Sequence, residues 1–490
     1  MAYKDRNTFD KPGQYTLQNL EIISYRRDSE TIEPIVMEIK GILFNLNLVE
    51  DIFTHNIVGS VVVYDMQDIR SLLPITGLEK LKLTLNSPGC KGYDHEFQIY
   101  KVDNVTEDPK KETAQLYQIF FCSPELYRNN ITTISKAYEG PVENAVLDIL
   151  RNDLKSNKKF FFEPTATNTK IVIPNLKPYD AIKLLAKNAV PSGFKNNSGY
   201  VFYEDATGFH FRSIASMMAM GGQEKTPALA KWAYSGIIPS TTDNSKQPEI
   251  KDIEKSMRSV IRADYEKPVD TLANMNNGMY ANQVIKHNAF NKTITITNFD
   301  YLKEGENQPH TEHSKDSGLL LPTKKSDKTK GVPYEDTGTG LNEKFDSKVM
   351  VKSSTTKGHN LYERPATAGL GNRTSQNQVL RNHNLSLLVY GNTLLNCGDT
   401  ITFSSQLKRP GQARDNEGLN PYTSGRYVIM AIKHIISTEA QKHEMVLKCF
   451  KDSVFNAYPS EEETLVEKIA SDVPENLYER QLKDLSNAQA

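Results

Sequence analysis

Short runs of alternating apolar and polar residues fill the chain from about residue 15 to 127, and they constrain its fold more than any other feature. Such alternation is typical of strands in a sheet with one buried and one wet face. Polar turns separate the runs at near-regular spacing, which favours a barrel or a sandwich. The predicted strands cover residues 36–48, 58–65, 80–85, 97–105 and 116–122. We therefore predict a first β-barrel domain over residues 1–127.

Two distant segments, residues 97–127 and 427–455, share a strand, a polar turn and a second strand. The offset between them is 330 positions at the first strand and 329 at the second, and a glycine with an alternating strand precedes each segment. This repetition indicates two copies of one barrel. Chance similarity between two hairpins remains the alternative. Three such chains about a three-fold axis would present six similar barrels, which would let a three-fold object dock onto a six-fold one.

The pattern changes at Pro141, where apolar residues begin to recur at helical spacing up to Leu150. Pro178 opens a second predicted helix, because proline suits the first helical turn. Two aromatic strands follow over residues 200–212, joined by a turn at Asp205–Gly208. We predict a small α/β domain with a hairpin over residues 128–235. Trp232, near its end, either anchors an interdomain linker or stacks on a ligand.

Residues 236–458 are predicted to form the second β-barrel domain, with a candidate strand pair at 281–286 and 293–297. The segment 302–360 is rich in polar residues and glycine, and we predict a polar insertion or long loop there, partly mobile in isolation. Residues 459–490 are acidic and then helical, and this tail either packs on its own domain or docks on a partner. The predicted fold class is α+β, mainly β: two similar tube-forming β-barrel domains flank a small α/β domain, and a helical tail follows.

The charge balance argues against a protein that holds nucleic acid, since 59 Lys+Arg face 60 Asp+Glu and leave a net charge of -1. Phosphate binding normally needs a basic excess, so we expect no sequence-specific nucleic acid binding. We see no signal peptide and no apolar run of about 18 residues, and we expect a protein that does not enter a membrane. The chain's four cysteines have no CxxC spacing, so we predict that they are free thiols. This fits synthesis of the protein in a reducing cytoplasm. They are Cys90, Cys122, Cys397 and Cys449.

The search for chemistry yields no phosphate loop, no nucleophile elbow and no zinc-protease motif. Gly369–Thr374 is only half of a dinucleotide fingerprint. His310 and His313 have metal-like spacing, but their polar surroundings predict a solvated loop. Glycosidase chemistry needs two carboxylates across a cleft, whereas Glu204–Asp205 and Glu461–Glu463 are predicted to be solvated. We therefore expect no enzyme: no catalytic, cofactor-binding or metal residue is named, and no cofactor.

Three stretches resemble the central baseplate hub proteins of contractile phage tails, of which the T-even hub protein is the type member. Phage late-control hub proteins and the N-terminal half of the type VI secretion spike protein VgrG are related to them. The likeness covers roughly residues 15–456 and rests on the order of packing patterns along the chain. The first stretch joins residues 59–65 to 72–83, the second joins 178–189 to 200–205, and the third joins 390–401 to 424–429.

The resemblance implies a homotrimer whose pseudo-six-fold ring joins the six-fold tail tube to the three-fold central spike, with a channel for genome passage. Its partners would be the tail tube protein, the central spike protein and other baseplate proteins. Its location would be the tail baseplate of a virion, after synthesis in the cytoplasm of the bacterial host. Two alternatives remain: a peptidoglycan hydrolase with β-rich wall-binding domains, and the hub of a secretion or bacteriocin-like injection machine.

Overall fold

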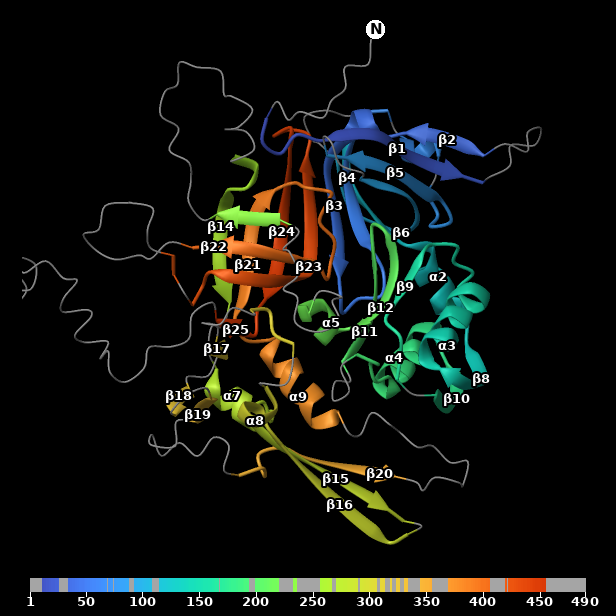
Figure 1. Cartoon of the computed structure of the whole chain (residues 1–490). Coiled ribbons are helices and arrows are strands. Elements are labelled where there is room, and N and C mark those ends of the chain that lie inside the picture. The colour runs from blue at the N-terminus through green and yellow to red at the C-terminus, as the bar shows by residue number, and fades with distance from the viewer. Residues whose placement is uncertain are drawn as a thin grey trace, which may run out of the picture.

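The computed structural model of the 490-residue chain is mainly β, with most of its helices gathered in two smaller regions (Figure 1). The structure describes residues 11–25, 34–67, 69–73, 75–87, 92–107, 114–166, 168–193, 199–219, 232–235, 256–266, 270–289, 291–305, 309–312, 318–319, 323–326, 330–333, 344–354, 369–405, 419–420 and 422–454. The predicted helical tail at 459–490 lies outside these residues, as do Cys90, His313 and Glu461–Glu463.

One large sheet organises the described part of the chain. Eleven of its strands run in the order β14-β21-β24-β23-β3-β4-β7-β6-β5-β1-β2, and β13 and β22 pair beside this path. Strands from the two ends of the chain therefore share one sheet. The strands of this sheet are β1 (Thr16–Ser24), β2 (Ile35–Glu38), β3 (Leu43–Asp51), β4 (Val58–Asp65), β5 (Lys80–Asn86), β6 (Tyr93–Glu107), β7 (Gln115–Cys122), β13 (Trp232–Ser235), β14 (Val260–Glu266), β21 (Asn384–Tyr390), β22 (Thr400–Ser404), β23 (Gly425–Ser437) and β24 (Lys442–Phe450).

A smaller α/β region packs beside the first part of this sheet (Figure 1). It contains the predicted hairpin, β11 (Tyr200–Asp205) with β12 (Gly208–Ser213), and the helix that Pro178 opens, α4 (Pro178–Asn188). Its other elements are α2 (Pro124–Ile131), β8 (Ile134–Pro141), α3 (Val142–Asp148), the π-helix η2 (Ile149–Asp153), β9 (Phe160–Phe162), β10 (Asn168–Leu176) and α5 (Ile214–Ala219).

The third region is a projecting ribbon in which β15 lies between β16 and β20 (Figure 1). It includes β20 and shorter strands, so the described residues within 302–360 do not form one long loop, while the prediction of an insertion stays a prediction. The sequence hides these strands because they are short and mostly polar. The elements here are α7 (Thr271–Asn276), β15 (Ala281–Asn288), β16 (Thr293–Asp300), α8 (Tyr301–Gly305), β17 (Gly318–Leu319), β18 (Thr323–Ser326), β19 (Lys330–Pro333), β20 (Val349–Ser354), α9 (Leu370–Val379) and β25 (Ser453–Val454). Two further short helices among the described residues lie beside the large sheet: α1 (Ile69–Leu72) and the 3-10 helix η1 (Lys40–Ile42).

Buried apolar side chains form four clusters, and each draws mainly on one stretch of the chain. One cluster lies under the first part of the large sheet, between Leu17 and Phe121, and another lies under the part between Leu380 and Phe450. A third fills the α/β region, and the smallest lies at the base of the projecting ribbon. The buried face of each strand follows its alternation, as expected from the period of two. None of the described helices combines the length and apolar character that a membrane crossing needs.

Candidate assembly surface

The large sheet contains the same five-stranded unit twice. The first unit has the spatial order β5-β6-β7-β4-β3, and the second has β22-β23-β24-β21-β14. Every neighbouring pair in both units is antiparallel. Each unit also uses its strands in the same order along the chain, with the edge strand β3 or β14 coming first. The repetition that the sequence indicates for one hairpin therefore extends to five strands.

Two irregularities recur at matching positions in the two units. The β6–β7 pairing shifts between Ile99 and Lys101, and the β23–β24 pairing shifts between Ile429 and Ala431. The other irregularity lies near the start of each edge strand. The β3–β4 pairing shifts at Phe44, and the β14–β21 pairing shifts at Ile261. A bulge inserts one residue and bends the strand, so a shared bulge indicates shared curvature. Coincidence between unrelated hairpins does not explain two bulges at matching positions.

The pairing also corrects the predicted offset at the second strand of the repeat. Gln98 pairs with Cys122, and its counterpart Val428 pairs with Phe450, so the second strands are offset by 328 positions and not by 329. The difference matters because a one-residue slip moves every side chain to the other face. With the corrected offset, the buried Ile119 corresponds to the buried Leu447. The prediction failed because β6 contains a further bulge between Asp103 and Thr106 that β23 lacks, and short apolar runs do not reveal a bulge.

The sheet has one face closed by the two clusters and one face that is partly open, which we call the open face. On β23, for example, Ile432, His434 and Ile436 are fully buried, whereas Lys433 is exposed. The open face mixes both charge signs: Lys80 pairs with Glu96 at 3.2 Å, and Arg262 pairs with Asp264 at 2.8 Å. Lys101 also forms an ion pair on this face, with Asp103.

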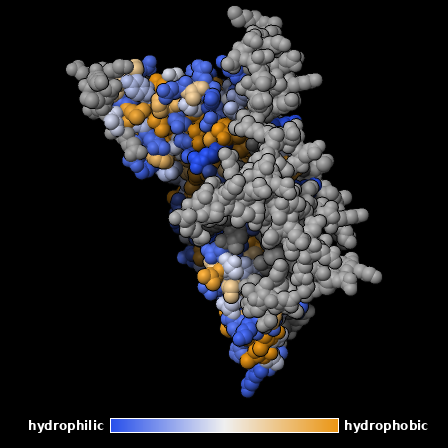
Figure 2. Space-filling model, turned by 90° about the vertical axis from the view of Figure 1, so that its left-hand side faces the viewer, coloured by the Kyte–Doolittle hydropathy of each residue, from blue (hydrophilic) through white to orange (hydrophobic). Residues whose placement is uncertain are grey.

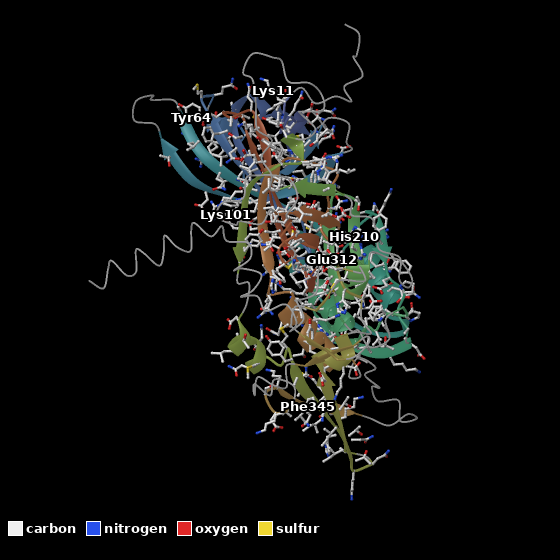
Figure 3. All side chains as sticks on the ribbon, turned by 60° about the vertical axis from the view of Figure 1, so that its left-hand side comes forward. Lys11, Tyr64, Lys101, His210, Glu312 and Phe345 are labelled. Atoms are coloured by element: carbon white, nitrogen blue, oxygen red, sulfur yellow. The ribbon has the colours of Figure 1, made fainter. Side chains whose placement is uncertain are left out.

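Tyr64 and Lys101 show how the open face extends along the sheet, from β4 to β6 (Figure 3). Seen from the β14 side, hydrophilic and hydrophobic residues alternate over the described surface (Figure 2). The projecting ribbon at the bottom of that view carries exposed apolar residues, among them Ile294, Ile296 and Val351. Ile296 and Val351 flank Ile285 on one face of the ribbon, because both pair with it.

The two units meet inside the chain, where residues 45–51 of β3 pair with residues 431–437 of β23. A buried polar chain lies at this junction: Tyr93 Oη bonds to Glu50 and lies 3.1 Å from His434 Nε2. His434 Nδ1 in turn lies 3.0 Å from His443 Nε2. Tyr93 has one hydrogen to donate. Tyr93 donates it to Glu50, so His434 Nε2 donates to Tyr93 and His443 Nε2 donates to His434 Nδ1, which leaves both histidines neutral.

The pKa values agree with a neutral chain. Burial raises the pKa of Glu50 to about 8, and the nearby Asp205 carboxylate adds to this rise. Burial lowers the pKa of His443 to about 3, and burial together with His443 lowers the pKa of His434 well below its usual range. All three groups are fully buried, so their charged forms are disfavoured. The junction between the units thus buries four polar side chains without burying a charge.

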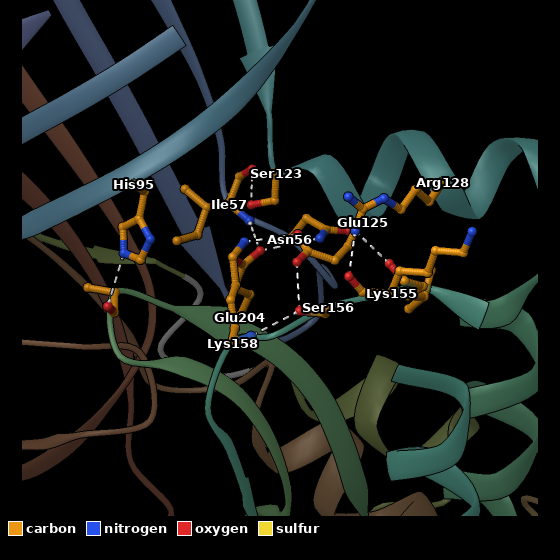
Figure 4. Close-up of polar contacts among 12 residues, drawn as sticks. Asn56, Ile57, His95, Ser123, Glu125, Arg128, Lys155, Ser156, Lys158 and Glu204 are labelled. Carbon is orange, nitrogen blue, oxygen red and sulfur yellow. Dashed lines mark hydrogen bonds and ion pairs between the residues drawn. The ribbon is translucent and has the colours of Figure 1, made fainter. Parts of the chain in front are cut away.

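A second polar cluster ties the α/β region to the first unit (Figure 4). Lys158 Nζ lies 2.9 Å from Glu125 Oε2 and 2.5 Å from Glu204 Oε1. The other oxygen of Glu204 accepts hydrogen bonds from Asn56 Nδ2 at 3.3 Å and from the Ile57 amide at 3.2 Å. Although burial opposes it, the charge of Lys158 lowers the pKa of Glu125. Glu204 therefore connects β11 to the turn between β3 and β4.

The structure corrects the prediction that Glu204 and Asp205 are solvated, since their exposed fractions are 1% and 2%. Asp205 accepts from the Thr207 and Gly208 amides at 2.7 and 3.2 Å and pairs with His210 at 2.8 Å. Despite its burial, the bonds from His210 lower the pKa of Asp205. Sequence reasoning missed both carboxylates because hairpin turns are usually exposed, and only the packing of β11 against β3 buries this one.

The remaining candidates also have structural explanations. His310 is not in a solvated loop, because its Nδ1 lies 2.8 Å from Asp452 Oδ2, and Asp452 is buried. Trp232 begins β13, which pairs with β22, and the Arg258 guanidinium lies 5.1 Å from its ring centre. Gly371, within the half fingerprint, packs against Asn282 and Phe299. Cys122, Cys397 and Cys449 are buried free thiols, as predicted.

The described residues line a partly open hollow of about 760 Å³ between the β3–β4 turn, α4 and α9. Its charged lining is mainly basic and includes Lys183, Arg373 and Lys448 beside Asp51. Burial lowers the pKa of Arg373. No group of three or more metal-ligating side chains occurs in the part of the chain that the structure describes.

Comparison with known proteins gives no matching family model and no matching curated protein. Among solved structures, a tail protein from Neisseria meningitidis MC58 is similar at 10% identity and a TM-score of 0.47, over 90% of this chain and 97% of that one. A 43 kDa tail protein of prophage MuSo2 from Shewanella oneidensis follows at 8% identity and 0.45, over 88% and 98%. An Escherichia coli component of the type VI secretion system matches at 9% and 0.40, over 91% and 79%.

Proposed function

We propose that this chain is the structural hub of a contractile-tail baseplate or of a related injection machine. In this role three copies form a ring of six similar five-stranded units. The ring joins a six-fold tail tube on one side to a three-fold central spike on the other, beside other baseplate proteins. The observation that carries the proposal is the repeated unit, which matches in strand order, pairing and two bulges. The chain acts in the baseplate of the tail, after synthesis in the host cytoplasm.

The repeated unit explains how a three-fold object meets a six-fold one. A trimer of single units would offer three equivalent docking positions, and a six-fold partner would leave half of its own positions unused. Two similar units per chain double that number without a second gene product. The two units differ in side chains, so the opposite end of the ring still presents three-fold features to a spike. The proposed domains follow from this: a tube-forming domain contains each unit, and the α/β region lies between them in the chain.

The open face supplies a lining for the proposed channel. Its lysines and arginine alternate with carboxylates, as in the pairs of Lys80 with Glu96 and Arg262 with Asp264. A lining with a basic excess would bind a passing polyanion through its phosphates. A balanced and hydrated lining holds neither sign of charge strongly. Passage of a genome through such a channel therefore needs no release step.

The decisive test of the proposed ring is the absolute mass of the purified protein by light scattering at several concentrations. The chain weighs 55.3 kDa, and the proposal expects three times that mass. Electron microscopy of the same sample should show six similar lobes around a central hole when the particles are viewed along the axis. A monomer at every concentration, or a trimer without a hole, contradicts the proposed ring.

A turbidity assay on purified peptidoglycan tests the non-enzymatic part of the proposal. The buried carboxylates Glu204 and Asp205 bond to Lys158 and His210, and they hold the fold together instead of facing each other across a cleft. We therefore expect the turbidity of the suspension to stay at the level of a buffer control. Lysis that increases with the amount of protein would overturn a purely structural role.

A further inference from the structure

The partly open hollow lies where the three regions of the structure meet. Its wall includes residues of α4 in the α/β region, of α9 and the turn after it, and of β24 in the large sheet. Cationic side chains from all three regions line this wall, and they are Lys183, Lys187, Arg373, Arg381 and Lys448. None of them forms an ion pair with a carboxylate in the part of the chain that the structure describes.

The positive charge of this wall is not balanced by the described residues around it. Asp51 is the one carboxylate among the described lining residues. Burial raises the pKa of Asp51, although Lys448 favours its charged form. Apolar side chains, such as Ile52 and Phe202, complete the wall and strengthen the fields of its charges by excluding water. The hollow is therefore suited to a segment with several carboxylates, because each one relieves the repulsion between the cations.

The described chain leaves the fold beside this hollow. Lys448 of β24 lies in the wall, and the described residues end six positions later, at Val454. Val454 belongs to the same buried cluster as Val379 of α9. The residue after Val379 is Leu380, which lines the hollow. Helix α9 thus contributes both to the wall of the hollow and to the site where the described chain ends.

An acidic run, Glu461–Glu463, follows within reach of the hollow. An extended chain advances about 3.3–3.6 Å per residue, so the seven residues from Val454 to Glu461 can span roughly 25 Å. Helix α9 has 10 residues and is therefore about 15 Å long. The acidic run can reach any part of a wall that α9 helps to form.

We propose that the acidic run Glu461–Glu463 binds in the hollow of its own chain and pairs with the cations of α4 and α9. The run then connects the α/β region to α9 and to the end of the large sheet, and it acts as an intramolecular clamp across three regions. Of the two alternatives that the sequence leaves open for residues 459–490, this is packing on the parent chain. The inference goes beyond the proposed function and does not depend on the ring.

The strength of this contact comes from the number of charges. A single ion pair that is open to solvent contributes little, whereas several charges that face each other form a network. The conformational freedom that the run loses on binding opposes the contact. Salt screens partly exposed charges. We therefore expect a contact that is strong at low ionic strength and weaker as salt is added.

A zero-length carbodiimide cross-link tests the contact in the full chain. The reagent joins a carboxylate to an amine only where the two groups touch, and mass spectrometry of the digested protein identifies the pair. We expect the peptide with Glu461–Glu463 to be joined to Lys183, Lys187 or Lys448, in protein that runs as a single chain on a denaturing gel. The link between Lys170 and Glu139, whose charged atoms lie 2.7 Å apart, shows that the reagent has acted.

The location of the cross-links decides the outcome. If the tail peptide is joined to Lys170 as often as to the lysines of the hollow, or is not joined to those lysines at all, the proposed contact is wrong. If the expected link occurs only in dimer bands, the hollow binds the run of another copy, and a link to a co-purified protein assigns the hollow to a partner. Both of these results also overturn the proposal. The ring is tested separately by light scattering, so it stands or falls independently.

Charge reversal of the run is a second test. The test variant carries Glu461→Lys, Glu462→Lys and Glu463→Lys. The matched control carries Glu475→Lys, Glu479→Lys and Asp484→Lys, which changes the net charge equally but further along the tail. Amides in residues 178–188 should exchange hydrogen at least about threefold faster in the test variant than in the wild type, since three weak ion pairs are lost. Equal exchange in the test variant and the control contradicts the proposal.

Reversal of the hollow in the same chain should restore the contact. Lys183→Glu and Lys187→Glu are combined with the reversed run, so that carboxylates on α4 again face lysines. The exchange of residues 370–379 in α9 is measured, because these residues carry none of the substitutions. We expect it to slow towards the wild-type rate in the combined variant. If the effects of the two sets of substitutions simply add, the run and α4 are not in contact and the proposal is wrong.

Discussion

Glu50 carries a buried carboxyl group whose ionisation opposes folding. It lies at the junction of the two units with Tyr93, His434 and His443, and the nearby Asp205 and Glu204 carboxylates disfavour its ionisation. A neutral hydrogen-bonded chain satisfies these groups, whereas a buried unpaired charge is costly. The histidines have the opposite sensitivity, since their lowered pKa values make them resist protonation in the folded state.

Glu50→Gln should therefore remove part of the pH dependence of stability. The folded pKa of Glu50, about 8, exceeds its ordinary value of 4.5, so the folded state binds more protons between these pH values. The free energy of unfolding contributed by this group is present below pH 4.5 and is lost as the pH rises through 8. Urea unfolding between pH 6.5 and 8.5 should show a falling midpoint in the wild type and a flatter one in the variant.

Glu96→Gln, at the exposed ion pair with Lys80, is the control and should keep the wild-type slope. An identical pH dependence in wild type and Glu50→Gln would show that Glu50 ionises as freely in the folded chain as in the unfolded one. Below about pH 6.5 the sign reverses, because His434 and His443 are held neutral and their contribution to stability is lost as the pH falls.

At the scale of elements, Lys158 holds the α/β region against the first five-stranded unit. Its ammonium group lies between Glu125 at the start of α2 and Glu204 at the end of β11, and both carboxylates are buried. Glu204 also accepts hydrogen bonds from the Asn56 side chain and the Ile57 amide, which lie just before β4. Removing the cation would leave two carboxylates facing each other in a buried site, which is the costly way to break an ion pair.

Lys158→Met should lower the free energy of unfolding by about 3–5 kcal/mol, as for other buried pairs that lose one partner. Lys170→Met is the matched control, because Lys170 and Glu139 form an ion pair in which both side chains are more than half exposed. An exposed pair contributes about 1 kcal/mol or less. Urea titrations of the two variants measure the difference, and a loss in Lys158→Met no larger than in the control would contradict the structural role of the cluster.

At the scale of the whole molecule, the β3–β23 contact makes one sheet from two repeated units, and the projecting ribbon stays outside it. The ribbon strand β16 is exposed along most of its length, whereas β3 and β23 alternate with fully buried residues. Regions with few buried apolar contacts open at lower free energy than the core. We therefore expect the large sheet to unfold as one cooperative unit, and the projecting ribbon to open separately at a lower free energy.

Hydrogen exchange followed by mass spectrometry should reveal this division. Amides in residues 43–51 and 425–437 should exchange with the same high free energy, because neither strand can leave the sheet without the other. Amides in residues 293–300 should exchange at a free energy several kcal/mol lower, through local opening. As urea is added, the exchange free energies of residues 43–51 and 425–437 should fall together. Clearly different free energies for these two segments would show that the units unfold independently.

Local pattern was enough to predict most of the large sheet, because a strand with one buried face alternates in sequence. Strands β4, β5 and β7 coincide with predicted runs within one residue at each end. The pattern failed at β14, where Arg262, Asp264 and Glu266 interrupt the apolar residues. An edge strand buries little, so alternation is weak there. Helix α9 was missed for a similar reason, since its sequence is mostly polar.

The sequence by itself determined the alternation of the strands and the existence of a repeat, since both are properties of neighbouring residues. Only the tertiary structure decided the register of the repeat, the burial of Glu204, and the pairing of β3 with β23. The last two features join residues that are between about 150 and 400 positions apart in the chain. No local pattern encodes which distant edges meet, because that choice depends on the burial of whole faces and on the satisfaction of backbone hydrogen bonds.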